Sequence, residues 1–439
     1  MTKNVLNFKL EFSETEEITP YAGLGLYGEM YRAIGLDKEI NRIFPEPGSR
    51  AGFKANTYIN PLTMMFIGGG KYIEDIRKVK VDEGLRKICK MEVVPSADAI
   101  GDWLRRDVEE KIESIKFIND NLTRKVLKRA EGEEFTLDID AMEIEAGKRE
   151  ALYTYNGNKG YMPIMGFIVE LDWCIKNELR EGNICPSERN YEFTKEIVEL
   201  VEGCNKRIAK FRSDSAGYQA RLMNYLNERG TKYTITVDHD VSVKDGIKRI
   251  EESEWKRLKD RDGIDTGREY AEFIHTQNKG DHAFRVVVQR WLNPQRDLFE
   301  ESQEYCYYGI ATNYLKEEKD SEEVIWWHNG RGNSENYNKE VKIGFNLDYM
   351  PCGDFKANAV WFSIGILAYN LFIASKLYLF PKSWLKKTIR TVRWQFIQMA
   401  GKIIRRSRYL ILRICSTLRE TFEIYEEARR RCWELQRTL

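Results

Sequence analysis

The sequence predicts a mixed α/β (α+β) protein, with a strand-rich centre between helical N- and C-terminal regions. Three observations support this. Apolar residues recur with helical periodicity from Tyr21 to about Arg129, short β-prone runs begin near Glu134, and residues 356–380 form an apolar helical segment. A chain of 439 residues can form two to four domains and bury a large core.

Residues 1–130 are expected to form a compact helical domain. The first 20 residues are polar and predict an extended arm. Apolar residues from Leu24 to Leu36 suit one helix face, and Gly35 could mark the end of that helix. Pro45–Gly48 predicts a loop. Further helical segments are expected at 61–70, 73–79 and 103–118.

Residues 131–238 change to a strand pattern. Strands are expected at 135–144, 152–155, 161–169, 207–213 and 233–237, and helices at 194–201 and 219–226. Asn156-Gly157 is a strong hairpin signal between the second and third strands. The predicted order is therefore three antiparallel strands, then helix, strand, helix and strand.

Residues 239–320 interrupt this order with a charged patch at 256–268 and alternating runs at 284–291 and 304–312, which predict a β-rich insertion. Residues 321–380 then carry a helix with Glu335 and the apolar segment. Its most apolar part, 359–374, contains Ser363 and Asn370 and is shorter than the ~20 residues of a membrane span. We expect a core helix there and no membrane partner.

Residues 381–439 predict a basic helical region for DNA contact, dimerisation or both. Lys382 to Arg419 holds eleven basic residues and no Asp or Glu, with Trp394 and Tyr409 among the interleaved aromatics. Such a segment suits contact with a phosphate backbone, and a solvated helix face is an equal alternative. The whole chain has a net charge of +1, which says nothing about nucleic acid.

The cysteines and histidines do not predict a metal site. The eight Cys are scattered without a Cys-x2-Cys pair, and the four His are isolated. Scattered cysteines without a signal peptide favour a reducing cytoplasm.

Arg331, Glu335 and Lys342 are the most informative residues. On a uniform α-helix, positions i+4 and i+11 lie about 40° and 20° from position i, so a carboxylate and two cations would share one face. Such a face suits a divalent metal beside phosphates. Glu340 would point about 140° away and serves as an inert neighbour. Glycines at 330 and 332 leave open that Arg331 precedes the helix.

Two β-prone runs end in aspartates that could complete a site with Glu335. Residues 135–140 end in Asp138-Ile139-Asp140, and residues 208–214 end in Asp214. Strand-end aspartates can project from a sheet edge into a cleft. Two of them with one helical glutamate could hold two Mg²⁺ ions about 3.5–4 Å apart, as phosphoryl transfer by two metals requires.

Several motifs along the chain occur together in the order of a known family. They lie at 68–76, 95–98, 137–141, 153–161, 212–218, 328–342 and 357–371. In this order they resemble DDE transposases of bacterial insertion sequences. The resemblance is to the cut-and-paste group with a Tyr-x2-Arg-x3-Glu-x6-Lys signature, and within it to the IS-thirteen-eighty-type branch. There are two departures: His328 stands at the signature tyrosine, and Met142 stands where a hydroxyl side chain is usual.

The resemblance implies an RNase H-like catalytic core formed by 131–238 and 321–380. Asp140, Asp214 and Glu335 would be the catalytic metal ligands, with Asp138 an alternative to Asp140. Two Mg²⁺ ions are expected, and Mn²⁺ is expected to substitute. The resemblance and the chemistry of the side chains together give six residues expected to contact phosphate or DNA: Arg212, Trp326, Trp327, His328, Arg331 and Lys342. One of the two tryptophans could instead be a core residue.

The implied activity is DNA transposition in a bacterial cytoplasm, at the nucleoid. Residues 1–130 would recognise the terminal inverted repeats, and a helical bundle without DNA contact is the alternative. A homodimer would pair the two ends, cut them, and join the 3′-hydroxyls to target DNA. Two other functions stay open: an RNase H-like nuclease without strand transfer, and a domesticated DNA-binding protein with a decayed site.

Overall fold

The computed structural model describes residues 16–48, 52–293, 305–407, 409–415 and 419–438, and the chain divides into two compact units. Unit 1 comprises Met1–Arg106, Gly344–Asn346 and Ala374–Leu439. Unit 2 comprises Asp107–Ile343 and Leu347–Ile373. The division after Arg106 differs from the boundary expected at 130, because helix α7 (Val108–Arg129) packs on strand β7 and helix α8 of unit 2.

Unit 1 begins with the helices that the N-terminal periodicity predicts. They are α1 (Leu24–Ala33), α2 (Leu36–Ile43), α3 (Asn56–Gly68), α4 (Ile76–Val81), α5 (Glu83–Ile88) and α6 (Ala97–Arg105). Gly35 and Gly69 adopt positive φ angles of 75° and 103° at the ends of α1 and α3, as helix-terminating glycines do. Tyr58 stacks on Trp103 with a ring separation of 4.8 Å. Most of the predicted polar arm lies outside the described residues.

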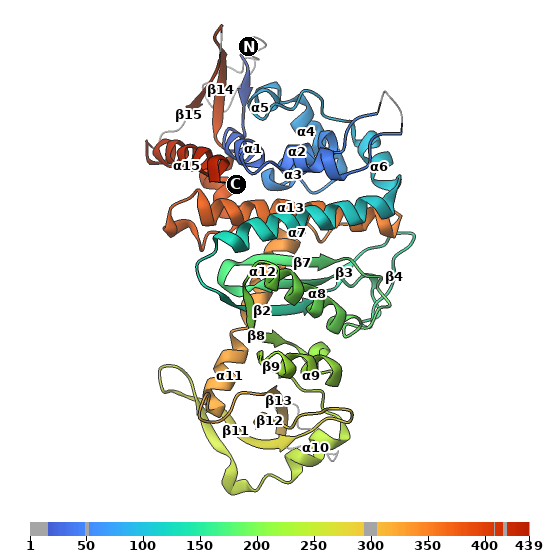
Figure 1. Ribbon diagram of the computed structural model, residues 1–439, viewed down its shortest axis with the longest axis vertical. Coiled ribbons are helices and arrows are strands. Elements are labelled where there is room, and N and C mark those ends of the chain that lie inside the picture. Colours follow the sequence, from blue (N-terminus) through green and yellow to red (C-terminus); the bar gives the residue numbers. More distant parts are fainter. Residues whose placement is uncertain (1–15, 49–51, 294–304, 408, 416–418, 439) are drawn as a thin grey trace, which may run out of the picture. The chain divides into compact units, whose positions relative to one another are not determined.

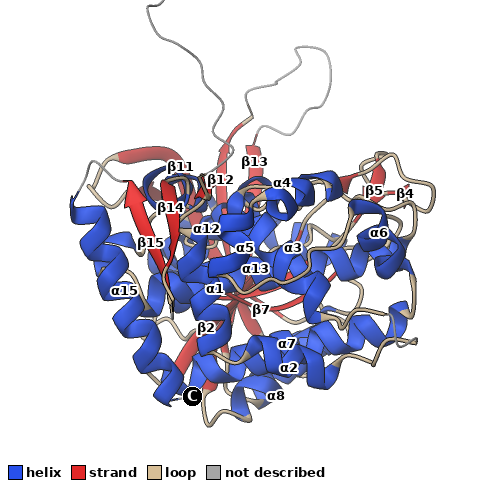
Figure 2. Ribbon diagram, turned by 90° about the horizontal axis from the view of Figure 1, so that it is seen from above, coloured by secondary structure: helices blue, strands red, loops and turns tan. Residues whose placement is uncertain are grey.

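The C-terminal part of unit 1 is not the continuous basic helix expected. After a short helix α14 (Ile389–Val392), strands β14 (Ala400–Arg405) and β15 (Leu410–Cys415) form an antiparallel hairpin. Strand β1 (Ile18–Thr19) pairs with β14, and α15 (Arg419–Thr438) ends the chain. Residues 400–405 pair with residues 410–415 along the whole of both strands, so their backbone hydrogen bonds are made across the hairpin and not within a helix. Figure 1 and Figure 2 show the hairpin beside α15.

Unit 2 is built on one nine-stranded sheet with the order β10-β11-β12-β13-β9-β8-β2-β6-β7 (Figure 1). Its core strands are β2 (Glu134–Ala141), β6 (Ile164–Ile168), β7 (Trp173–Glu178), β8 (Arg207–Ser213) and β9 (Lys232–Thr236). Strands β2, β6 and β7 are successively antiparallel, whereas β8 and β9 lie parallel to β2. Helix α8 (Asn190–Glu202) connects β7 to β8, and helix α9 (Ala220–Glu228) connects β8 to β9. This is the RNase H-like order expected from the sequence.

Of the three predicted antiparallel core strands, the runs at 135–144 and 161–169 contain most of β2 and all of β6, whereas the run at 152–155 does not join the core sheet. The run at 152–155 contributes only β4 (Leu152–Tyr153), which joins β3 (Ile144–Glu145) and β5 (Lys159–Tyr161) in a separate small sheet. The hairpin at Gly157 does form there, with φ 82°. The run at 161–169 splits at Pro163 into β5 and β6, because proline has no backbone N–H for the ladder. The third core strand is β7, which was not predicted.

The insertion extends the core sheet. Strands β10 (Lys256–Lys259), β11 (Asp265–His275), β12 (Phe284–Leu292) and β13 (Tyr305–Thr312) form an antiparallel meander, and β13 pairs with β9. Helix α10 (Val241–Lys248) precedes them. The predicted β-rich character of this segment is confirmed.

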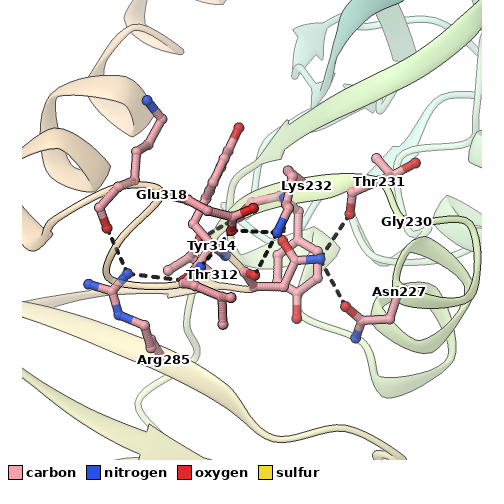
Figure 3. Close-up of polar contacts among 12 residues, drawn as sticks. Asn227, Gly230, Thr231, Lys232, Arg285, Thr312, Tyr314 and Glu318 are labelled. Atoms are coloured by element: carbon pink, nitrogen blue, oxygen red, sulfur yellow. Dashed lines mark hydrogen bonds and ion pairs between the residues drawn. The ribbon is translucent and has the colours of Figure 1, made fainter.

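A polar network fixes the point where the insertion returns to the core (Figure 3). Arg285 donates to the carbonyls of Tyr314 and Lys319, at 3.0 and 2.8 Å. Asn313 donates to Asn227 and to the Thr231 carbonyl, both at 2.9 Å. These bonds hold the segment that leads from β13 into α11 (Ser321–Asn329), and so help to set where the next helix begins.

Helices cover both faces of the core. Successive residues of a strand point to opposite faces of the sheet. In β6, Phe167 stacks on Tyr337 of α12 (Gly332–Lys339) on one face, and on the other face a Cβ at Gly166 would lie 2.6 Å from Ile197 of α8. Helix α13 (Phe355–Tyr378) shares the Phe167 face through Tyr369. Its length and composition would suit a membrane span, but 94% of its most apolar window is buried inside the structure. This is the burial expected of a core helix.

Candidate active site

The two aspartates predicted as ligands lie at the ends of neighbouring parallel strands. Asp140 is the last residue but one of β2, and Asp214 follows directly after β8. In the register of these strands Ile139 lies opposite Ser213, so the next residues, Asp140 and Asp214, follow side by side at the ends of the two strands. Adjacent strands are about 4.8 Å apart. The sheet therefore brings both carboxylates to one edge.

The pKa of Asp140 is raised above its ordinary value. Its side chain is 14% exposed, and burial raises its pKa to about 6. The Arg331 guanidinium opposes this rise, whereas the negative charge of Asp214 adds to it. The charge of Asp214 thus disfavours the ionised form of Asp140, and a bound cation would relieve this repulsion. Asp214 accepts a 3.1 Å hydrogen bond from the Ala216 amide, which fixes its orientation at the strand end.

Helix α12 lies against Asp140. Arg331 is the residue before the helix, and its Nη1 lies 3.5 Å from Asp140 Oδ1. Asn338 donates from Nδ2 to Asp140 Oδ2 at 2.6 Å. Glu335 lies between them in sequence, on the first turn of the helix, and is exposed. The structure therefore brings Arg331 to the predicted site, but as an ion-pair partner of Asp140.

The helical register assumed for Glu335 and Lys342 needs correction. Helix α12 ends at Lys339, and Glu340–Gly344 forms a short π-helix. A π-helix has more residues per turn than an α-helix, so the angular positions of Glu335 and Lys342 calculated for a uniform α-helix do not hold. Lys342 donates to the Glu143 carbonyl at 2.8 Å, three residues beyond Asp140. It therefore stays near the end of β2, and its contact with phosphate stays a prediction.

Asp138 and Arg212 form a buried ion pair on the same sheet face as Asp140 and Asp214. Arg212 Nε and Nη2 each lie 2.7 Å from one oxygen of Asp138, whose side chain is fully buried. Burial raises the pKa of Asp138, and the two bonds from Arg212 oppose this rise. The Asp138 side chain is fully buried, whereas that of Asp140 is 14% exposed, so Asp140 is the more accessible of the two alternatives for a metal. Arg212 is 3% exposed, so its expected contact with DNA does not fit this placement.

His328 is buried as well, which corrects its expected role as a phosphate contact. Its side chain contacts three hydroxyl groups: Thr234 from Nδ1 at 3.0 Å, and Thr236 and Tyr308 from Nε2 at 3.1 Å. Burial lowers the pKa of His328 to about 3, and the nearby Arg331 and Arg212 add to the effect. The imidazole is therefore neutral at pH 7, and it joins α11 to β9 and β13.

The two tryptophans have different surroundings. Trp326 packs against the apolar cluster of Leu258, Val287, Ile310, Val324 and Ile325, so it is a core residue of α11 and the insertion. Trp327 is half-buried among three cations, with Lys210, Arg212 and Lys319 each 5.0–5.4 Å from its ring centre. Stacking of Trp327 on a base stays a prediction.

The donor set fits a hard divalent cation at Asp140 and Asp214, because both offer carboxylate oxygens. A third carboxylate does not lie with these two among the described residues. Among the residues that the structure describes, no group of three His, Cys, Asp or Glu side chains lies close enough to hold a metal. Arg331 and Asn338 contact the two oxygens of Asp140 instead.

Asn338 is the contact that sequence reasoning missed. It follows Arg331 by seven residues and Glu335 by three, so it shares their face of α12. Extending that helical face by one turn would have found it. The Asp138–Arg212 pair had a weaker signal, because it joins residues 74 positions apart through a strand register that the sequence does not reveal.

Comparisons with known proteins identify the family of the chain. The sequence matches the family described as "Transposase DDE domain group 1" over residues 6–431. Among solved structures, the chain is similar to the piggyBac transposase in a cryo-EM synaptic complex with hairpin DNA. The two have a TM-score of 0.45 and 12% identity over 85% of this chain and 79% of that one. A comparison with curated proteins found no significant match. The family match extends over nearly the whole sequence, and the chain belongs to the DDE transposase domain family, group 1.

Proposed function

We propose that this protein is a cut-and-paste DNA transposase of the IS-thirteen-eighty type, acting at the nucleoid of a bacterial cytoplasm. It binds the terminal inverted repeats of its element, cleaves DNA there, and transfers the 3′ ends to target DNA. One observation carries the proposal: Asp140 and Asp214 lie side by side at the ends of neighbouring parallel strands, and the helix that bears Glu335 lies on Asp140 through Asn338.

The side chains divide the chemistry between them. Asp140 and Asp214 would hold Mg²⁺, or Mn²⁺ in its place, with Glu335 as the third carboxylate. Bound metal would activate the attacking oxygen and stabilise the leaving oxygen of the phosphodiester. Arg331 offsets negative charge at Asp140, and Lys342 places a second cation near the end of β2. A guanidinium and an ammonium at these positions suit a DNA phosphate.

The partners follow from the same proposal. Residues 1–130, whose first part forms the helices α1–α6 of unit 1, recognise the terminal repeats. A homodimer pairs the two transposon ends. Removal of residues 1–106, where unit 1 meets unit 2 in sequence, should therefore abolish preference for transposon ends over random duplex.

A strand-transfer assay separates this function from its two rivals. Purified protein is mixed with Mg²⁺, a labelled duplex carrying one transposon end, and supercoiled target plasmid. The proposal predicts labelled plasmid joined at the 3′ end. Cleavage without joining would indicate an RNase H-like nuclease. End binding without cleavage would indicate a domesticated DNA-binding protein.

A further inference from the structure

The hairpin of β14 and β15, residues 400–415, is a basic ribbon with an exposed tip. Its strands pair from Ala400 with Cys415 to Arg405 with Leu410, and the Arg406 amide donates to the Tyr409 carbonyl at 3.0 Å. Among the residues that the structure describes, β1 pairs with Gly401 and Lys402 at the base of the hairpin, and the Ile403 amide donates to the Glu17 carbonyl at 2.8 Å. The tip therefore extends beyond the three-stranded part of the sheet, and Figure 1 shows the hairpin projecting from the helices of unit 1.

Two arginines at the tip have no counterion within the described part of the chain. Arg405 and Arg406 are exposed, and neither forms an ion pair there. They line a cavity of about 340 Å³ together with Lys87, Ser407, Tyr409 and Leu410. Tyr409 and Leu410 are 64% and 42% exposed. Cations and an exposed aromatic ring thus gather at one end of a narrow ribbon.

Several other cations of the C-terminal region pair with glutamates. Lys402, at the base of the hairpin, pairs with Glu16. On α15, Arg429 pairs with Glu29 at 2.7 Å, and Arg430 pairs with Glu427 and Glu434. At the hairpin tip, in contrast, the adjacent Arg405 and Arg406 form no ion pair with any residue that the structure describes. Adjacent like charges repel each other, and an anionic ligand would offset this repulsion.

The shape of the ribbon favours duplex DNA among the possible anionic ligands. Each strand has six residues, which at about 3.3 Å per residue gives roughly 20 Å. The major groove of B-DNA, about 12 Å wide, admits a two-stranded β-ribbon. Arginine forks match phosphate oxygens. We propose that the β14–β15 hairpin binds duplex DNA as a ribbon, with Arg405 and Arg406 on phosphates. This rests on the proposed function and assigns the DNA contact of 381–439 to the hairpin.

The test is the salt dependence of binding to a duplex carrying one transposon end, measured with the full chain and without divalent metal. The double variant Arg405→Gln/Arg406→Gln removes two charges and keeps side-chain length. Arg429→Gln/Arg430→Gln removes two charges from α15 and is the matched control. Arg405→Lys/Arg406→Lys keeps the charge. Thermal unfolding of each variant checks the fold, and the hairpin variants should melt like the wild type because the two arginines form no ion pair there.

Each phosphate contact contributes about 0.9 to the slope of log K against log salt concentration. The hairpin Gln variant should lower the magnitude of the slope by about 1.8, the Lys variant should retain the wild-type slope, and the α15 control should change it by less than half as much. An unchanged slope in the hairpin Gln variant would overturn the inference and point to another partner, such as an acidic protein. An equal loss in the α15 control would also overturn it. Both results leave the proposed function standing, whereas wild-type protein that binds no DNA would defeat both.

Discussion

Asn338 of α12 donates a 2.6 Å hydrogen bond to Asp140 at the end of β2, and thereby ties the helix of Glu335 to the strand of the first aspartate. This bond spans 198 residues of sequence. It connects two of the three carboxylate-bearing elements, and Arg331 reinforces the connection from the helix N-terminus. A side chain that is not itself a proposed metal ligand can therefore decide how well the carboxylates are placed.

Loss of this amide should impair cleavage without impairing DNA binding. Asn338→Ala removes a hydrogen bond to an ionisable carboxylate, an interaction of about 1.5–3 kcal/mol, so cleavage should fall by roughly tenfold or more. Asn336→Ala is the control, because Asn336 lies on the same helix and is exposed. The measurement is the cleavage rate on a duplex carrying one transposon end. Equal rates for Asn338→Ala and Asn336→Ala would show that the bond does not position the site.

Glu335 and Glu340 should differ sharply. Glu335 is exposed on the first turn of α12, whereas Glu340 begins the π-helix and lies close enough to the buried Tyr369 to influence its hydroxyl electrostatically. Glu335→Gln should reduce cleavage at least a hundredfold, as expected for a lost metal ligand. Glu340→Gln should leave cleavage within a few fold of wild type. If the two variants lose activity equally while both remain folded, the third ligand is not Glu335.

The Asp138–Arg212 pair should contribute to stability. Arg212→Ala leaves the Asp138 carboxylate buried without a counterion, and such a change costs about 3–5 kcal/mol. Arg207→Ala on the same strand is the control, since Arg207 is exposed and its ion pair with Glu134 contributes little. Urea denaturation measures both. A loss below about 1 kcal/mol for Arg212→Ala would mean that the pair is not the buried unit described above.

His328 should make the protein less stable in mild acid. Its folded pKa of about 3 lies below the usual 6.5, so the unfolded chain binds the proton more readily. Its contribution to stability is complete above pH 6.5 and is lost as the pH falls toward 3. Between pH 6.5 and 5, wild type should lose roughly 1.5 kcal/mol more unfolding free energy than His328→Gln, measured by urea denaturation. Parallel pH profiles would contradict this.

The sequence predicted those parts of the fold that local patterns determine. Strand β8 was placed at 207–213, where the structure has it, because a β-prone run ends there in Ser213-Asp214. Strand β7 was missed, because Trp173-Cys174-Ile175-Lys176 shows no clear alternation: all four side chains are buried. The β14–β15 hairpin was read as helix, because arginines between apolar residues fit both periods over so short a segment.

The candidate site likewise has features that the sequence predicts and features that it does not. The adjacency of Asp140 and Asp214 followed from two strand-end aspartates, and the parallel pairing of β2 with β8 produces it. The burial of Arg212 and His328 could not be predicted, because their partners Asp138, Thr234 and Tyr308 come from other strands. Sequence spacing identifies which side chains have suitable chemistry, whereas sheet register decides which of them reach solvent.

The central claim is that Asp140 and Asp214 support metal-dependent DNA cleavage. The most direct test compares wild type with Asp214→Asn on a labelled duplex carrying one transposon end, in Mg²⁺, Mn²⁺, Ca²⁺ or chelator. We expect wild type to cleave in Mg²⁺ and Mn²⁺ but not in Ca²⁺, whose bonds are longer and whose geometry is looser, or in chelator. Asp214→Asn should bind the duplex as wild type does and should not cleave. Cleavage by wild type in chelator, or by Asp214→Asn at the wild-type rate, would contradict the account.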